Sequence, residues 1–122
     1  MTYKVLNAID YGIPQVRNRV FVVGFKDHNI NYNYPDPKPL NLTVQDLLEE
    51  KADSKYFLNQ GFLDNYVFVQ WGTWNRHPKV DKPIASTLTT KMGTLRATQD
   101  NYQTQDGRIR KLTPREGLRL MG

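Results

Sequence analysis

Two short segments near the start of the chain have the hydrophobic pattern of β-strands. Residues 4–9 and 20–25 are rich in aliphatic and aromatic side chains, and the second segment is apolar at almost every position. A strand that is apolar on both faces belongs inside a covered sheet. The residues between the two segments include Gly12 and Pro14, which predict a turn. Because two buried strands are not stable alone, this hairpin requires a larger sheet around it.

A proline-rich stretch separates this hairpin from the rest of the chain. Pro35, Pro37 and Pro39 stand at alternate positions and predict an extended linker, because proline fixes the backbone and lacks an N–H donor. Thr43 follows as a candidate N-cap for a short helix at residues 44–51, whose apolar side chains fall on one face. We therefore predict a domain boundary at the prolines.

Short strands and loops are predicted for the middle of the chain. Residues 66–71 and 84–90 are strand candidates, because each is a short run with β-branched or aromatic side chains. A polar loop at residues 72–78 follows the first candidate, and Lys91-Met92-Gly93 predicts a turn after the second.

The last part of the chain carries the two clearest local signals. Asp106-Gly107 lies between two short strand candidates, which is typical of a tight hairpin. Thr113, Pro114 and Glu116 occupy the N-cap, first and third positions of a capping box, which predicts a final helix. The whole pattern predicts an α+β, β-rich fold of short twisted strands and loops with few short helices.

Composition excludes several kinds of chemistry. The 122 residues include no cysteine and two distant histidines, so disulfides and thiol nucleophiles are excluded and no metal site is expected. The apolar runs are far shorter than the roughly 20 residues that cross a bilayer, so no membrane partner is expected. The sequence has no glycine-rich cofactor loop and no Ser/His/Asp arrangement. From the residues alone, we expect a binding module without a complete active site.

The positive charge is concentrated in one half of the chain. Residues 71–122 carry ten Lys and Arg against four Asp and Glu, a net +6, whereas residues 1–70 carry seven against eight, a net −1. This asymmetry favours a polyanionic partner, most simply a nucleic acid. A basic surface that only improves solubility is the alternative.

Side chains that can read DNA bases are interleaved with this charge. Trp74, Asn75 and Arg76 share one loop, and Lys91 and Arg96 flank a glycine-containing turn. Arg and Lys can bond to guanine edges and Asn to adenine, while Thr hydroxyls hold phosphates. The alternative is that Trp71 and Trp74 belong partly to the core and that the loop is merely polar.

Two segments resemble motifs of the DNA (cytosine-5) methyltransferase family. Gln15, Arg17 and Arg19 form a Gln-x-Arg-x-Arg pattern between two strands, which is similar to the family's eighth motif. Residues 110–122 resemble the opening of its ninth motif. Between them, residues 83–89 look like the Thr-Leu signature of the family's target-recognition domain.

This resemblance implies a division of the chain into three parts. Residues 1–40 would be the C-terminal hairpin of a Rossmann-like catalytic domain together with the linker. Residues 41–109 would be the target-recognition domain, and residues 110–122 the start of the motif-nine helix.

The resemblance also implies roles for individual residues. Members of the family flip the target cytosine out of the duplex. Arg19 corresponds to the arginine that bonds the oxygen on carbon 2 of that cytosine, with Gln15 and Arg17 supporting the pocket. Thr87 corresponds to a hydroxyl near the phosphate at the flipped base. Arg115 and Arg119 are expected to brace the domain junction.

The two recognition loops of the family correspond to residues 72–79 and 90–94. The resemblance therefore implies that DNA-binding residues lie in and beside these loops, and three of them are our candidates for contacts to bases: Trp74, Arg76 and Lys91. The other expected DNA-binding residues are Asn75, Thr89 and Arg96.

The chain departs from the family pattern in its catalytic segments. It lacks the S-adenosylmethionine loop, the Pro-Cys nucleophile segment and the Glu-Asn-Val segment of the family. We therefore expect a piece of a larger enzyme, whether excised, truncated or one chain of a split enzyme, that binds duplex DNA and the rest of the catalytic domain. By itself it should bind no S-adenosylmethionine and transfer no methyl group. A catalytically inactive DNA-binding module is the alternative; an RNA substrate is less favoured. The resemblance implies a cytoplasmic protein encoded by a bacterium or phage.

Overall fold

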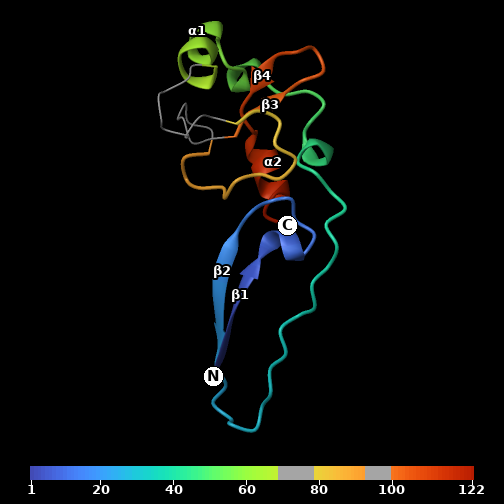
Figure 1. The fold of residues 1–122 in the computed structure, drawn as a ribbon, viewed down its shortest axis with the longest axis vertical. Helices are drawn as coiled ribbons and strands as arrows, with labels where there is room; N and C mark the ends of the chain where they lie inside the picture. The colour runs from blue at the N-terminus through green and yellow to red at the C-terminus, as the bar shows by residue number, and fades with distance from the viewer. Residues whose placement is uncertain (69–78, 93–99) are drawn as a thin grey trace.

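The computed structural model describes residues 1–68, 79–92 and 100–122. Over these ranges, the fold consists of two separate antiparallel sheets of two strands each and a few short helices. A long hairpin forms one end of the molecule and the remaining elements gather at the other end (Figure 1). This agrees with the predicted α+β class of short strands with few short helices, but the described part is not β-rich, since its helical elements hold more residues than its strands.

The first hairpin is confirmed, with both strands beginning about two residues earlier than predicted. Strand β1 (Thr2–Asn7) pairs antiparallel with β2 (Asn18–Val23), so that Thr2 faces Val23 and Asn7 faces Asn18. The 3₁₀ helix η1 (Ala8–Asp10) ends β1, because its residues turn back into local hydrogen bonds.

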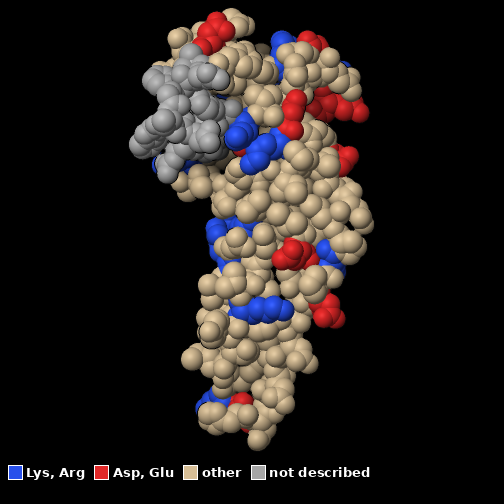
Figure 2. All heavy atoms as spheres, in the orientation of Figure 1, with Lys and Arg blue, Asp and Glu red and all other residues tan. Residues whose placement is uncertain are grey.

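The prediction that β2 is buried on both faces is not met within the described part of the chain. Val20 is 62% exposed, Phe21 49% and Val22 61%. The sheet that contains β2 has only two strands here, so the larger sheet that the prediction requires is absent from the described part of the chain. In Figure 2 this end of the molecule is mostly uncharged surface.

The linker is extended, as its prolines predict, and it runs back along the length of the hairpin (Figure 1). The Tyr34 hydroxyl lies within hydrogen-bond distance of the carbonyl oxygens of Thr2 and Phe21, at 3.2 and 3.0 Å. Nearer the core, the Lys38 N–H donates to the Asp10 carbonyl at 2.7 Å. The linker is therefore held against the hairpin at both of its ends.

Among the described residues, the hydrophobic core lies beyond the linker and forms two clusters. The larger one contains Val44, Ala85, Tyr102, Leu112 and Leu120. The smaller one contains three further buried side chains: Leu63, Val67 and Ile109. Within the part of the chain that the structure describes, the β1–β2 hairpin contributes no residue to either cluster.

The predicted helix at residues 44–51 is wrong in extent. The structure has a single 3₁₀ turn, η2 (Gln45–Leu47), after which Leu48 is extended. A tertiary contact competes with the helix: the Glu49 N–H donates to the Glu116 carboxylate at 2.7 Å instead of to a helical carbonyl. Another short 3₁₀ helix, η3 (Ser54–Tyr56), follows.

The predicted strand at residues 66–71 is also wrong where the structure describes it. Helix α1 (Gln60–Phe62) continues into a π-helical turn, η4 (Leu63–Val67). Leu63 and Val67 are four positions apart, so a helical turn places both against Ile109 in the smaller cluster. Residues 69–71 of this prediction, and the loop at 72–78, lie outside the described residues.

Residues 84–90 form an irregular segment rather than the predicted strand. Ala85 makes an isolated parallel bridge with Gln15, and no ladder extends it among the neighbouring described residues. The predicted turn is present at residues 90–92; its Gly93 lies outside the described part.

The second hairpin and the final helix are confirmed. Strands β3 (Tyr102–Gln103) and β4 (Ile109–Arg110) are shorter than predicted but pair antiparallel around the expected turn. Gly107 has a φ of +84°, a left-handed conformation that glycine adopts without strain. Helix α2 (Pro114–Arg119) begins with the full capping box of Thr113 and Glu116.

Candidate functional site

The loop between β1 and β2 packs against the irregular segment after residue 84. The Val16 N–H donates to the Ala85 carbonyl at 2.9 Å, and the Ala85 N–H donates to the Pro14 carbonyl at the same distance. Segments about 70 positions apart therefore share a pair of backbone hydrogen bonds. We call this contact between residues 14–17 and 85–88 the clasp.

Two side chains of the Gln-x-Arg-x-Arg pattern hold one residue of the clasp. The amide oxygen of Gln15 accepts from the Leu88 N–H at 3.1 Å, and Arg17 donates from Nη1 to the Leu88 carbonyl at 3.2 Å. Gln15 is fully buried and donates from Nε2 to the Leu120 carbonyl at 2.6 Å. The backbone of Leu88 is thus fixed from both sides and tied to the end of α2.

The expected hydroxyl also belongs to this contact. Thr87 is exposed and donates its Oγ1 proton to the Val16 carbonyl at 2.6 Å. The oxygen keeps its lone pairs as acceptors. In the adjoining turn, the Lys91 N–H donates to the Thr89 hydroxyl at 3.3 Å.

Arg19 differs from the other two residues of the pattern. It lies in β2 opposite Leu6, is exposed, and donates from Nη1 to the carbonyl of its neighbour Asn18 at 2.7 Å. The structure therefore brings Gln15, Arg17 and Thr87 together. Four other expected DNA contacts lie outside the described residues: Trp74, Asn75, Arg76 and Arg96.

The contribution of the clasp to stability can be tested by substituting Gln15. Gln15→Ala should lower the free energy of unfolding by about 1–3 kcal/mol for each hydrogen-bonding group that it leaves unpaired, namely the Leu88 N–H and the Leu120 carbonyl. Urea denaturation measures the change. The exposed Gln105→Ala serves as the control and should shift stability by less than about 0.5 kcal/mol. Equal stability of the two variants would contradict a structural role for Gln15.

A buried ion pair that the sequence analysis did not assign joins β4 to α2. Arg110 and Glu116 are 1% and 0% exposed and form a two-pronged contact, with Nη2–Oε1 at 2.6 Å and Nη1–Oε2 at 2.8 Å. The Glu116 carboxylate also accepts from the backbone amides of Glu49 and Thr113, both at 2.7 Å. The capping box gave a partial signal, because it already placed a carboxylate at this helix start.

The surroundings of Glu116 favour its charged form. Burial by itself would raise its pKa, but the hydrogen bonds from Arg110 and from two backbone amides outweigh burial. The pKa of Glu116 is therefore held below its ordinary value of 4.5.

The two arginines expected at the domain junction contact the same segment. Arg119 donates from Nη1 to the Leu47 carbonyl at 2.8 Å, and Arg115 forms an ion pair with Glu49 at 3.3 Å. Both contacts link α2 to the residues that follow the linker.

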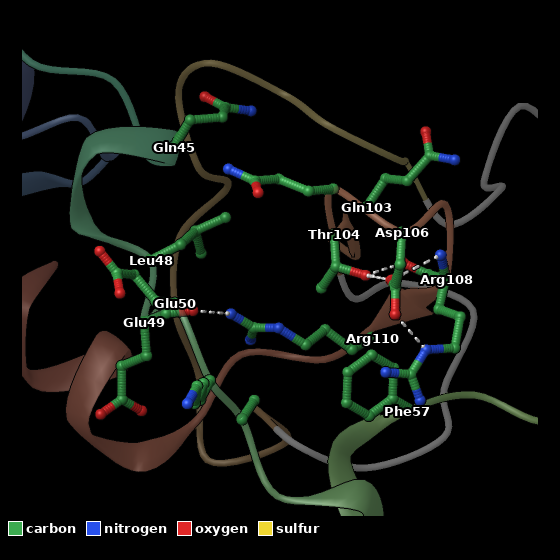
Figure 3. Close-up of a pocket in the computed structure, with 13 residues that line it drawn as sticks. Gln45, Leu48, Glu49, Glu50, Phe57, Gln103, Thr104, Asp106, Arg108 and Arg110 are labelled. Atoms are coloured by element: carbon green, nitrogen blue, oxygen red, sulfur yellow. Dashed lines mark hydrogen bonds and ion pairs between the residues drawn. The ribbon is translucent and has the colours of Figure 1, made fainter.

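A groove with a volume of about 990 Å³ separates residues 45–52 from the β3–β4 hairpin (Figure 3). The Arg110 side chain extends across it, and Asp106 bonds to Arg108 at 2.7 Å. Arg108 also stacks over the Phe57 ring at 4.1 Å. Asp106 and Arg108 thus pair with each other across the turn of this hairpin, whereas Arg110 pairs with Glu116 of α2.

Ion pairs engage part of the basic surface of residues 71–122. Carboxylates pair with Lys82, Arg108, Arg110 and Arg115. The partner of Arg115, Glu49, lies outside this half of the chain, whereas the other three partners are already counted in its net charge of +6. Within the described ranges, no group of three or more His, Cys, Asp or Glu side chains is placed to hold a metal ion, and no helix has the length and hydropathy to span a bilayer.

Comparison with known proteins defines the class. The model of the C-5 cytosine-specific DNA methylase family matches residues 1–122, so the chain belongs to this family.

Individual relatives agree with this assignment. The Type II methyltransferase M.Bsp6I of Bacillus sp. (strain RFL6) is 36% identical, with 98% of this chain and 42% of the relative covered. M.HhaI of Haemophilus parahaemolyticus is 35% identical, with 98% and 41% covered. The structure of the Entamoeba histolytica methyltransferase EhMeth superposes with a TM-score of 0.68 at 15% identity, covering 99% of this chain and 41% of that one. The chain thus spans about two fifths of the length of these proteins.

Proposed function

We propose that the chain is the target-recognition region of a DNA (cytosine-5) methyltransferase, joined to one hairpin of its catalytic domain. The intact enzyme would transfer a methyl group from S-adenosylmethionine to a cytosine in a specific duplex sequence. The clasp is the observation that carries this proposal. It couples a loop of the eighth-motif type to the Thr-Leu segment through Gln15, Arg17 and Thr87.

The exposed hairpin supports the proposed division of the chain. An apolar strand surface as open as that of β2 marks an interaction site, and the proposed partner is the rest of the catalytic domain. That domain would supply the nucleophile and hold S-adenosylmethionine, which provides the methyl group. The core residues lie after the linker, so residues 41–109 are proposed as the recognition domain and residues 110–122 as the helix that braces it.

Within this proposal, each residue has a defined task. Arg19 would bond the oxygen on carbon 2 of the flipped cytosine, where a cation stabilises the negative charge that develops during attack on the ring. Gln15 and Arg17 would support the pocket for this base by fixing the backbone of Leu88 through their hydrogen bonds. Thr87 and Thr89 would lie near the phosphates, with Lys91 and the loop residues Trp74, Asn75, Arg76 and Arg96 reading the duplex.

The charge distribution predicts salt-sensitive DNA binding. If three to five basic side chains meet phosphates, a plot of log affinity against log salt concentration for the 122-residue chain should have a slope of about −3 to −4.5. Fluorescence anisotropy with a labelled duplex measures this slope. A slope near zero would indicate that the basic half is only a solvated surface.

The central experiment is methylation of a random duplex pool by the intact methyltransferase that carries this chain, read by bisulfite sequencing. We expect methylated cytosines within one short sequence. Lys91→Ala and Arg76→Ala should each weaken discrimination at one base pair by about 1–3 kcal/mol. Methylation without any sequence preference, or none with added S-adenosylmethionine, would contradict the proposal.

A further inference from the structure

A glycine inside α2 leaves space that another segment fills. Gly117 is buried, and a Cβ atom added to it would lie 2.6 Å from Cε and 2.7 Å from Sδ of Met92. Carbon atoms in favourable contact are about 3.5–4.0 Å apart. The end of the Met92 side chain therefore occupies the position that a side chain at residue 117 would need.

The helix itself does not require glycine here. Gly117 has no left-handed φ, and glycine weakens a helix relative to alanine. Glycine at this buried position leaves free the space that the end of the Met92 side chain fills. Gly117 thus forms a local notch in α2, and the flexible thioether of Met92 occupies this notch.

Met92 belongs to the turn that carries Lys91. Its N–H donates to the Thr89 carbonyl at 3.0 Å. At the other end of the same segment, Leu88 is bound by Gln15, which also bonds Leu120 at the end of α2. The segment 88–92 is therefore linked to α2 at both of its ends, through Gln15 at Leu88 and through the contact of Met92 with Gly117.

We propose that Gly117 is a positioning residue for sequence recognition: its notch seats Met92 and thereby fixes the turn that presents Lys91. This inference rests on the proposed function and deepens it. Gly117 touches no DNA in this account and acts through Met92.

The test uses the random-pool methylation assay with the intact enzyme. Gly117→Ala should reduce discrimination at the base pair read by Lys91 by about 5-fold, the lower end of the value of a base contact. Its melting temperature should change little, because the stronger helix propensity of alanine offsets the displacement of the flexible Met92 side chain. Met92→Ala should cause a similar loss of discrimination, and the double variant should add little, because both changes remove one contact.

Gly61→Ala is the matched control, because its added Cβ would lie an ordinary 3.6 Å from Asn59 Oδ1. It should leave discrimination unchanged. If Lys91→Ala weakens discrimination but Gly117→Ala does not, the positioning role is overturned while the proposed function stands. If neither variant changes discrimination, the recognition role of the turn is overturned, and this inference with it.

A measurement independent of activity uses the three methionines of the chain. With ¹³C-methyl labelling, Gly117→Ala should shift the Met92 signal and leave that of the exposed Met1 in place. An unchanged Met92 signal would overturn the notch, whatever the methylation assay shows.

Discussion

Arg19→Ala in the intact methyltransferase is expected to slow methyl transfer by about 100- to 1000-fold while leaving DNA affinity and site choice nearly unchanged. In the proposed mechanism, Arg19 contacts the flipped base alone, and its bond strengthens as charge develops on the ring. The prediction is motivated by a difference in the hydrogen bonds of the three residues. Gln15 and Arg17 donate to backbone carbonyls elsewhere in the fold, whereas Arg19 makes its hydrogen bond to the adjacent Asn18.

Single-turnover methylation and duplex binding measure the two effects separately. Arg19→Lys is the matched variant: it keeps the charge but loses the planar guanidinium, so its rate should fall between those of the native enzyme and Arg19→Ala. Relaxed site choice with a normal rate for Arg19→Ala would reverse the roles assigned to β2 and the recognition turn.

Glu116→Ala is expected to lower the free energy of unfolding by about 3–5 kcal/mol, because it leaves the buried Arg110 guanidinium without its counter-ion. The backbone amides of Glu49 and Thr113 lose their acceptor in the same step. Urea denaturation monitored by tryptophan fluorescence and by circular dichroism measures the loss. The exposed Glu50→Ala is the control and should stay within about 0.5 kcal/mol of the native chain. Similar stability of both variants would show that the pair contributes little.

The same carboxylate predicts a pH dependence. Because the folded-state pKa of Glu116 lies below its ordinary value of 4.5, its contribution to stability is fully present above that value. The contribution is lost as the pH falls through the lowered folded-state pKa. Glu116→Gln should therefore flatten the stability curve on the acid side, and an unchanged acid-side slope would argue against this titration.

Local sequence determined the elements that form from neighbouring stretches of the chain. The turn at Gly107 and the capping box at Thr113 were predictable, because a turn residue or cap satisfies nearby backbone groups. The β1–β2 hairpin was predictable because its two apolar strands follow one another in the sequence. The Gln-x-Arg-x-Arg pattern likewise pointed to the loop that forms one side of the clasp.

Only the tertiary structure decided the secondary structure at positions where a distant group competes with a local one for a hydrogen bond or a packing contact. The helix expected after Thr43 stops at one turn because Glu49 bonds to Glu116, 67 positions away. The strand expected at residue 66 is a helical turn in the described part, since Leu63 and Val67 must both reach Ile109. Gln15 and Arg17 bond to the backbone of Leu88, more than 70 positions away. Met92 likewise packs against Gly117. No local pattern in the sequence encodes either contact. Periodicity reports which side chains avoid water, but the partner that buries or bonds each of them is fixed only when the whole chain packs.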